Sequence, residues 1–423
     1  MKPTLRVLCV LPCVPIPAET GGAQRTLALV KALDQAFSVT VLALLTEGCN
    51  PAAFREELSG RLRVVDPTSG LLWRLAAEPR SLALGTPLRY ARYVSPPVRA
   101  ALAELLREEK FDIAHFDHPH MGQLLPMVRR AQPDVRVVLD EHNVEAHLLQ
   151  SYAALLKWPQ AVLLRRQAAR VMALERRLVR QADATLACSD ENAADLRRLG
   201  ARHVAVIPNG VTIDPRGRGP WKDRNGLVFI GSLDWRPNVD AAMRLATRIW
   251  PRVRDAIPGS YLAIVGRRPP PRLRECASER VLVTGRVDSV APYLRSARAT
   301  AVPLRAGSGT RIKIIEAWAA GVPVIANRLA AEGLAYSNGQ NMLIADTDEG
   351  FADAIARVWH DPDLASRLAS RGEQTAVRYD PAKIGQRLVS FYAAGLWPAE
   401  EEAEESARAY TIPAYRSATA RTE

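Results

Sequence analysis

Residues 304–326 read LRAGSGTRIKIIEAWAAGVPVIA. The apolar run that leads into them, Ala299–Leu304, predicts the end of a buried strand, and Pro323–Ala326 predicts another strand. Gly307 and Gly309 let the chain between the two runs turn tightly with its backbone amides exposed. Strand, glycine-rich loop, helix and strand in this order indicate part of a parallel α/β sheet.

The helix predicted after this loop begins with two cations. Ile312, Ile315 and Ala319 recur at helical spacing, and Arg311 and Lys313 lie in the first turn. The free amides and the positive end of the helix dipole disfavour cations there, by roughly a few tenths of a kcal/mol each. A bound anion such as a diphosphate would reverse that preference. The pattern therefore favours an anion site, and side chains that simply point into water are the alternative.

The whole chain has 423 residues, of which 48% are hydrophobic and 24% charged, enough for two domains with separate cores. Its formal net charge of +12 indicates an anionic partner. Arginines are concentrated in the helical stretch 163–181, which is typical of a solvated helix face or of docking on an anionic membrane surface. The sequence has no zinc spacing, no RNA-recognition signature and no basic patch interleaved with aromatic residues, so we expect no nucleic-acid partner.

The five cysteines are scattered and lack CxxC spacing, which predicts reduced core residues in a cytoplasmic protein. Three prolines interrupt the short apolar run in residues 1–17, so we interpret that run as a first strand and not as a signal peptide. No apolar stretch reaches the length of a membrane span. We expect a cytoplasmic location, with peripheral attachment to the inner face of the plasma membrane as a further option.

Strand-like and helix-like runs alternate in both halves, which predicts the α/β class with two Rossmann-like, doubly wound domains facing each other across a cleft. The predicted strands are Arg6–Leu11, Val39–Leu44, Ile113–Phe116, Arg136–Leu139, Ala184–Cys188 and Ala205–Ile207 in the first half, and Leu227–Ile230, Tyr261–Val265, Val281–Thr284, Thr300–Pro303 and Pro323–Ala326 in the second. The predicted divisions are an acceptor-side domain over 1–207, a linker over 208–226, a nucleotide-sugar domain over 227–380, a helix over 381–397 that crosses back to the first domain, and a mobile tail over 398–423.

Seven motifs follow one another along nearly the whole chain. They are the glycine-rich loop at 21–25, EHNVEA at 141–146, IPNGV at 207–211, FIGSLDWRPNVDA at 229–241, VTGRVDSVAPYL at 283–294, the segment 303–326 and AAEGL at 330–334. In this order they resemble the GT-B glycosyltransferases, and within them the retaining family 4 enzymes. The resemblance implies a GT-B fold with a nucleotide-sugar donor bound by the second domain.

The resemblance also implies roles for single residues. His142 corresponds to a catalytic histidine that contacts the donor sugar, and a polar loop residue without that role is the alternative. Gly21, Gly22 and Arg25 correspond to the loop that meets the acceptor or the phosphates. Glu316 corresponds to a glutamate whose carboxylate accepts hydrogen bonds from two ribose hydroxyls.

Some positions depart from the family pattern. Ser308 stands where a second glutamate usually lies near the transferred sugar, and Ser232 and Asn238 stand at or near the places of a diphosphate-binding arginine and lysine. Arg311 and Lys313 would supply the missing charge at the departing diphosphate as catalytic groups, without a metal ion. The GSGTR-K---E arrangement resembles a bacterial subgroup of sugar transferases associated with exopolysaccharide synthesis.

Five further residues complete the predicted donor site. Gly309 and Thr310 would offer backbone amides to the diphosphate. Arg286 and Val287 stand where the family holds the edge of the nucleobase by backbone contacts. Glu332 would either meet the sugar hydroxyls or cap a helix.

The segment AHFDHPH crowds three histidines around one aspartate. These residues are His115, His118, His120 and Asp117. A metal site is one interpretation. Because the resemblance implies no metal, we favour acceptor-side hydrogen bonding or a structural loop, and we expect neither a metal nor a cofactor besides the nucleotide-sugar co-substrate.

These patterns predict a glycosyltransferase that moves a sugar from a nucleotide-sugar donor to a glycan or lipid-linked acceptor, with retention of configuration implied by the resemblance alone. One alternative is a GT-B epimerase that acts on the nucleotide sugar itself. A second is a catalytically impaired protein that binds nucleotide sugars, which the missing glutamate, arginine and lysine make plausible.

Overall fold

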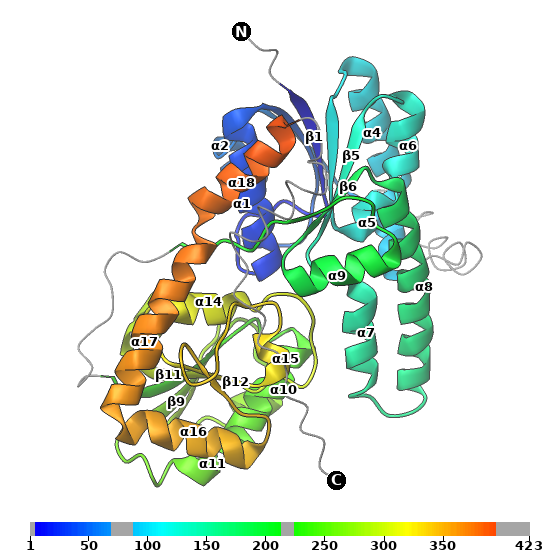
Figure 1. Ribbon diagram of the computed structural model, residues 1–423. Helices are drawn as coiled ribbons and strands as arrows, with labels where there is room; N and C mark the ends of the chain where they lie inside the picture. Colours follow the sequence, from blue (N-terminus) through cyan, green and yellow to red (C-terminus); the bar gives the residue numbers. More distant parts are fainter. Residues whose placement is uncertain (1–4, 69–87, 213–223, 395–423) are drawn as a thin grey trace, which may run out of the picture.

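The computed structural model describes residues 5–68, 88–212 and 224–394, which form two α/β domains, one above the other in Figure 1. Residues 213–223 of the predicted linker, 395–397 of the predicted last helix and the whole predicted tail 398–423 lie outside the described residues. The first domain contains a seven-stranded parallel sheet in the order β3-β2-β1-β4-β5-β6-β7. Its strands are β1 (Arg6–Leu11), β2 (Ser38–Leu44), β3 (Arg61–Val65), β4 (Ile113–Asp117), β5 (Arg136–Glu141), β6 (Ala184–Ala187) and β7 (Val204–Val206).

The second domain contains a six-stranded parallel sheet in the order β10-β9-β8-β11-β12-β13. Its strands are β8 (Gly226–Ile230), β9 (Tyr261–Val265), β10 (Val281–Val283), β11 (Ala297–Val302), β12 (Val324–Ala326) and β13 (Leu343–Ile344). The α/β class is thereby confirmed. All eleven predicted strands are present, and the structure adds β3 and β13.

Helices cover both faces of each sheet, as Figure 1 shows. In the first domain they are α1 (Gly21–Ala36), α2 (Pro51–Glu56), η1 (Leu88–Val94), α4 (Pro96–Glu108), α5 (His118–Gly122), α6 (Leu125–Ala131), α7 (Glu145–Ala153), α8 (Gln160–Gln181) and α9 (Asp190–Leu199). In the second they are α10 (Arg236–Arg244), η3 (Leu245–Ile249), α11 (Trp250–Val253), α12 (Pro271–Arg274), α13 (Ala291–Ser296), α14 (Ile312–Ala319), α15 (Arg328–Ala331), α16 (Asp348–His360) and α17 (Pro362–Ala376), followed by η4 (Val377–Tyr379) and α18 (Pro381–Ala393). None of the helices in the described ranges combines the length and the apolar character that crossing a bilayer requires.

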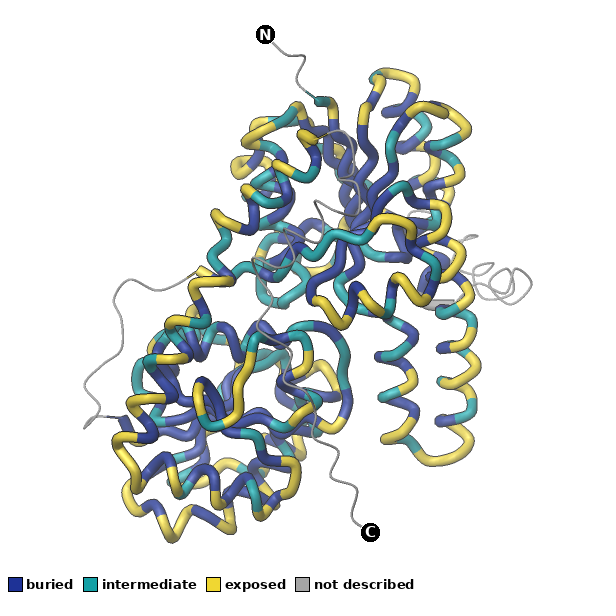
Figure 2. Tube along the Cα trace, in the orientation of Figure 1, coloured by how far each residue is buried: buried dark blue, intermediate teal, exposed yellow. Residues whose placement is uncertain are grey.

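The strands are buried on both faces, which explains why they are continuous apolar runs in the sequence. Along β1, the side chains of Val7 and Cys9 pack into the cluster beneath α1, whereas Leu8 and Val10 pack into the cluster beneath α4 and α6. This alternation is the period-two geometry of a strand. Figure 2 shows the sheets of both domains as buried chain enclosed by partly exposed helices.

The last described helix, α18, follows the second domain in sequence but packs on α1 of the first. Tyr392 is fully buried there, and its hydroxyl lies 2.7 Å from His115 Nδ1. The chain therefore crosses between the domains twice. The first crossing includes Val211 and the second includes Tyr379. The two are in contact, because the amide of Val211 donates to the carbonyl of Tyr379 at 2.9 Å.

Replacing Tyr392 with alanine is expected to lower the free energy of unfolding by about 3–5 kcal/mol, because it removes a buried aromatic ring from the core of the first domain. Urea denaturation followed by circular dichroism measures this loss. Tyr336→Ala is the control, because the Tyr336 side chain is exposed. An equally small loss in both variants would show that α18 adds little to the first domain.

Candidate active site in the interdomain cleft

Three loops from the two domains meet at the cleft, and glycines allow their close approach. A Cβ atom on Gly21 would lie only 2.8 Å from Cδ1 of Ile312 in α14. A Cβ atom on Gly309, where φ is +74°, would lie 2.8 Å from the carbonyl oxygen of His142. A side chain at Gly309 would force the loops apart because it would meet backbone, whereas one at Gly21 would displace the end of the Ile312 side chain. The glycine-rich loop, the His142 loop and the donor loop are therefore brought together, as the sequence motifs predicted.

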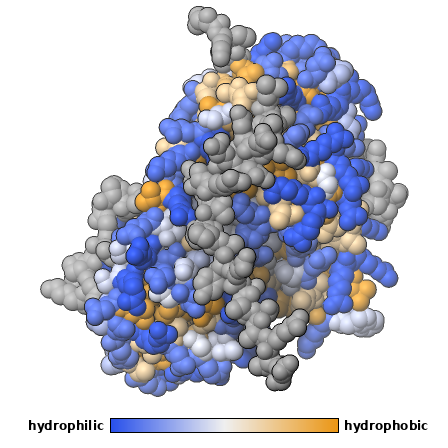
Figure 3. All heavy atoms as spheres, viewed as in Figure 1, coloured by the Kyte–Doolittle hydropathy of each residue, from blue (hydrophilic) through white to orange (hydrophobic). Residues whose placement is uncertain are grey.

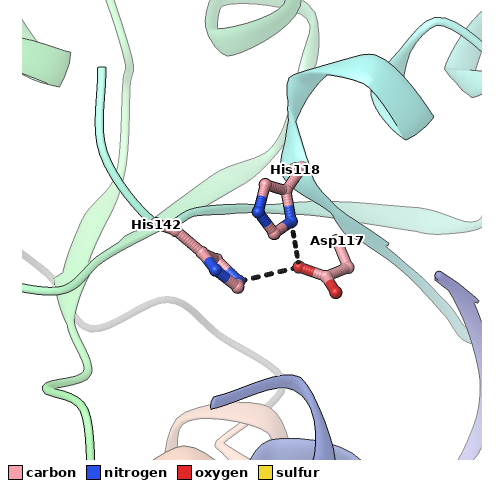
Figure 4. A group of neighbouring side chains, drawn as sticks. All are labelled: Asp117, His118 and His142. Atoms are coloured by element: carbon pink, nitrogen blue, oxygen red, sulfur yellow. Dashed lines mark hydrogen bonds and ion pairs between the residues drawn. The ribbon is translucent and has the colours of Figure 1, made fainter. Parts of the chain in front are cut away.

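His142 follows β5, and its ring lies against two carboxylates at the ends of neighbouring strands. Figure 4 shows one of these contacts, with Asp117, beside His118. Its Nε2 atom is 2.8 Å from Oδ1 of Asp117 and 3.4 Å from Oδ2 of Asp140. His118 Nδ1 lies 2.7 Å from the same Asp117 oxygen, and the two imidazole rings are 3.7 Å apart. His118 holds this position with a φ of 69°, a left-handed conformation that non-glycine residues rarely adopt.

These contacts fix the charge of His142. Burial alone would lower the pKa of its imidazole, but the charges of Asp117 and Asp140 raise that pKa to about 9. His142 is therefore an imidazolium near neutral pH. Its Nδ1 atom faces the glycine-rich loop, because a Cβ atom on Gly22 would lie 3.5 Å from it. The site thus holds a proton donor where the resemblance placed a contact to the donor sugar.

Arg25 lies behind this histidine and not in the cleft. It is 2% exposed, and its guanidinium donates to both oxygens of Asp140, at 3.1 and 2.6 Å. A further nitrogen donates to the carbonyl of Ile207 at 2.6 Å and to Oδ1 of Asn209 at 3.2 Å. Because α1 begins at Gly21, Arg25 lies on the buried face of this helix. The role of the loop Gly21, Gly22 and Arg25 at the acceptor or the phosphates stays a prediction. Arg25 instead joins the histidine site to the IPNGV linker.

Lys313 is half-buried at the start of α14. Its Nζ atom donates to Oδ1 of Asn238 at 2.7 Å and lies 4.4 Å from the centre of the Phe229 ring. Burial, with a smaller effect from Arg311, lowers the pKa of Lys313 to about 7. Asn238 in turn donates to the carbonyl of Ser232 at 3.0 Å, so these two residues position the lysine.

Arg311 is buried, being 7% exposed, and burial lowers its pKa to about 10. One terminal nitrogen donates to the carbonyl of Leu329 at 3.2 Å, while the other is buried without a hydrogen-bond partner. Neither Arg311 nor Lys313 forms an ion pair with a carboxylate of the described residues. The alternative that both side chains point into water is wrong.

The rest of the donor loop also faces the first domain. The Thr310 hydroxyl lies 3.4 Å from the carbonyl of Cys188, and the Ser308 hydroxyl is buried without a partner. Burial raises the pKa of Glu316, and a hydrogen bond with Gln24 of α1 opposes that shift. A cavity of about 930 Å³ lies beside Glu316, bounded by α1, α13, α14 and α18. This volume is in the range of sites for small molecules and cofactors.

Arg286 takes part in a contact between the domains. It lies 2.7 Å from a carboxylate oxygen of Glu19, and Arg267 lies 3.0 Å from the other. Arg286 is thus apart from the cations of α14. Val287 is half-buried against the core of the second domain, and Glu332 is exposed just after α15, where a helix cap remains an alternative to sugar binding.

The sequence did not single out Asp140, Glu19 or Arg267 as site residues, and it gave Asp117 only a metal-site alternative. One signal was available for the two aspartates, because both lie at the carboxyl ends of adjacent parallel strands, where side chains from distant segments converge.

The comparison with known families covers both domains. Residues 20–215 match the family Glycosyltransferase Family 4, and residues 224–361 match Glycosyl transferases group 1. The chain belongs to the GT-B glycosyltransferases. Each match covers most of one of the two α/β domains.

Relatives of this glycosyltransferase include a phosphatidyl-myo-inositol mannosyltransferase of Mycobacterium leprae, 25% identical over 70% of this chain and 77% of that protein. A glycogen synthase of Mycobacterium tuberculosis is 28% identical over 51% of this chain and 58% of that protein. Among solved structures, the sucrose-phosphate synthase of Thermosynechococcus elongatus superimposes with a TM-score of 0.70 at 18% identity, over 92% of this chain and 98% of that one. HepE of Anabaena, solved in complex with UDP-glucose, superimposes with a TM-score of 0.64 at 16% identity, over 92% of this chain and 99% of that one.

Among the described residues, Asp117, His118 and His142 form the group that could hold a metal ion, with one ligand atom each within 4.8 Å of one another. The same atoms form two ion pairs, so a metal ion there would displace the proton from His142 Nε2. His115 bonds Tyr392, and the ring of His120 packs on Tyr93, so these two histidines have other contacts.

Replacing Asp117 with asparagine is expected to lower the pKa of His142 from about 9, because the nearest negative charge is lost while burial remains. Histidine-selective NMR titration measures this pKa. The control is Asp195→Asn, which removes an exposed partner of His147 and should leave the titration of His142 unchanged. An unshifted His142 in the Asp117 variant would contradict the assigned network.

Proposed function

We propose that this glycosyltransferase transfers a sugar from a nucleotide-sugar donor, held mainly by residues 227–345, to a glycan or lipid-linked acceptor held by residues 1–205. The observation that carries the proposal is a pair of cations at the start of α14, the buried Arg311 and the half-buried Lys313, which form no ion pair with a carboxylate of the described residues. A diphosphate would pair with both cations and with the free amides of the helix. The UDP-glucose bound by HepE supports this class of donor.

The chemistry follows from where charge develops. As the sugar departs from the diphosphate, negative charge forms on the bridging oxygen, and in this proposal Arg311, Lys313 and the amides of residues 308–310 stabilise it. The His142 imidazolium donates a hydrogen bond to the sugar or its phosphate. The acceptor hydroxyl attacks from the same face, giving retention. Closure of the domains excludes water and limits hydrolysis.

We propose that the reaction requires no metal ion or further cofactor, because the two cations of α14 supply the charge that a metal would provide. The +12 net charge and the resemblance to exopolysaccharide-associated transferases support a role in cell-surface or exopolysaccharide synthesis. The proposed location is the cytoplasm, at the inner face of the plasma membrane.

A thermal-shift panel of UDP, GDP, dTDP, ADP and their common sugars tests the donor site. A ligand at about a hundred times its dissociation constant stabilises the folded protein by roughly 2.7 kcal/mol. Stabilisation by one nucleotide family supports the donor site and names the base. No stabilisation by any of them contradicts the site.

Two other functions make different predictions. A GT-B epimerase would convert its nucleotide sugar without any acceptor, which analysis of the products detects. A catalytically impaired binding protein is favoured by Ser308, which stands where the family has a glutamate, and it would bind a nucleotide sugar without transferring it.

Replacing Lys313 with alanine is expected to lower the rate of glycosyl transfer by roughly 100- to 1000-fold, which is the usual loss when one group that stabilises a transition state is removed. Replacing Glu316 with alanine is expected to weaken binding of the nucleotide sugar. Steady-state kinetics with the donor identified by thermal shift separates the two effects. Lys383→Ala is the control, since Lys383 is exposed on α18. Undiminished transfer by both variants would place the donor site elsewhere.

The pKa of Lys313 gives donor binding a pH dependence of known sign. In the protein without a donor, Lys313 has a pKa of about 7, and a bound diphosphate raises that pKa. Above neutral pH, the protein therefore takes up a proton when it binds the donor. Affinity for a nucleotide sugar should be highest below pH of about 7 and fall by up to about tenfold per pH unit above it. Both phosphates of a nucleotide sugar are esterified, so the ligand itself does not titrate here.

Isothermal titration calorimetry in buffers of different ionisation enthalpy measures this proton uptake. Lys313→Arg is the matched control, because an arginine keeps the charge over this pH range. It should bind without proton uptake and with little change in affinity between neutral and mildly basic pH. Equal proton uptake by the wild type and the arginine variant would assign the titration to another group.

A further inference from the structure

The hairpin formed by α7 and α8 extends beyond the body of the first domain, and its far end is exposed (Figures 1 and 2). Trp158 lies at this end with 81% of its side chain exposed, next to Leu155 at 37% and Leu163 at 63%. Large apolar side chains are otherwise exposed only at scattered places in the described residues. In Figure 3, pale and orange spheres lie among blue ones over the lower end of this hairpin.

The same segment is strongly basic. Residues 146–174 contain no aspartate or glutamate, whereas Lys157, Arg165, Arg166 and Arg170 lie among them. Lys157, Arg165 and Arg166 are exposed and form no ion pair with the described residues. Unpaired cations beside exposed apolar side chains are complementary to a surface that is anionic outside and apolar beneath.

The base of the hairpin is firmly built, so its end is held in place. The carboxylate of Glu175 in α8 accepts hydrogen bonds from the amides of Glu145 at 2.6 Å and Ala146 at 3.3 Å, at the start of α7. Val171 and Leu178 are buried in the core of the first domain. Packing therefore accounts for the apolar residues of α8 near the body, but not for those at the far end.

We propose that residues 155–166 are a docking surface for an anionic lipid bilayer. Trp158, Leu155 and Leu163 enter the interface between headgroups and acyl chains, where tryptophan is preferred. Arg165 and Arg166 pair with lipid phosphates, while their aliphatic stems lie against the apolar layer. The helices lie on the membrane and do not span it.

Docking there would place the cleft beside the membrane. The Ser151 hydroxyl, one turn from the exposed end, accepts a hydrogen bond from the amide of Gly307 in the donor loop at 3.2 Å. The Tyr152 ring packs edge-on against Trp235, with 5.4 Å between the ring centres. The placement of the cleft beside the membrane rests on the proposed function, because it would bring the donor loop close to a lipid-linked acceptor. The docking surface itself does not depend on it.

Co-sedimentation of the full-length protein with vesicles tests the proposal. We expect binding to vesicles made of equal parts phosphatidylcholine and phosphatidylglycerol, weak binding to phosphatidylcholine alone, and release by salt. The variants W158S/L163S and R165E/R166E should each bind the mixed vesicles on the order of tenfold more weakly. Tryptophan emission of the wild type should shift to the blue on binding, and that shift should be smaller in W158F.

Matched controls carry the same changes elsewhere. L282S/V377S alters two exposed apolar side chains of the second domain, and R367E/R371E reverses two exposed arginines of α17. Both should bind like the wild type, and circular dichroism should show all variants folded. Wild-type protein that stays in the supernatant with mixed vesicles would overturn the proposal, as would control variants that lose as much binding as the hairpin variants.

A dimer detected by light scattering that W158S/L163S dissociates, without vesicle binding, would assign the surface to a second copy of the chain and also overturn the proposal. Vesicle binding needs no nucleotide sugar. A failed donor panel with intact vesicle binding would therefore reject the proposed function alone, and the reverse result would reject the docking surface alone.

Discussion

The buried ion pair between Arg25 and Asp140 is the contact on which the rest of the site depends. Both side chains are about 1% exposed, and the pair lies between α1, the end of β5 and the linker after Ile207. Breaking a buried pair by removing one partner typically costs about 3–5 kcal/mol, because a charge is left without compensation. The position of His142, the position of the glycine-rich loop and the path of the linker therefore depend on one set of contacts.

The cleft has an uneven distribution of charge that follows from this arrangement. On the first-domain side, Asp117 and Asp140 are matched by His142 and Arg25, so little net charge remains. Facing them, the cations of α14 form no ion pair with the described residues and bond polar groups, among them Asn238 for the lysine. The uncompensated charge lies where helix amides also point, and both favour an anionic ligand over an empty site.

The sequence predicted the fold well because parallel strands buried on both faces are uninterrupted apolar runs. It missed β3, Arg61–Val65, which is an edge strand with two exposed arginines, and β13, which has only two residues. It placed Arg25 in the glycine-rich loop but did not predict the ion pair of Arg25, because a motif gives a position but not the direction of a side chain. The pairing of Arg25 with Asp140 joins residues 115 apart in sequence, and no local pattern reports such a contact.

The contacts between the domains differ in kind, and this difference sets how the cleft can open. The two chain crossings are joined by a backbone hydrogen bond from Val211 to Tyr379, and Gly210 packs so closely on Pro381 that a Cβ atom would lie 3.0 Å from its Cα. Across the mouth of the cleft, the contacts include the partly exposed pairs of Glu19, the hydrogen bond from Gly307 to Ser151, the edge-on packing of Tyr152 on Trp235 and the 3.4 Å contact of Thr310. Exposed ion pairs contribute only about 0–1 kcal/mol each. A movement that opens the cleft about the two crossings would therefore break side-chain contacts and a loop hydrogen bond at the mouth, while the closely packed crossings act as the hinge.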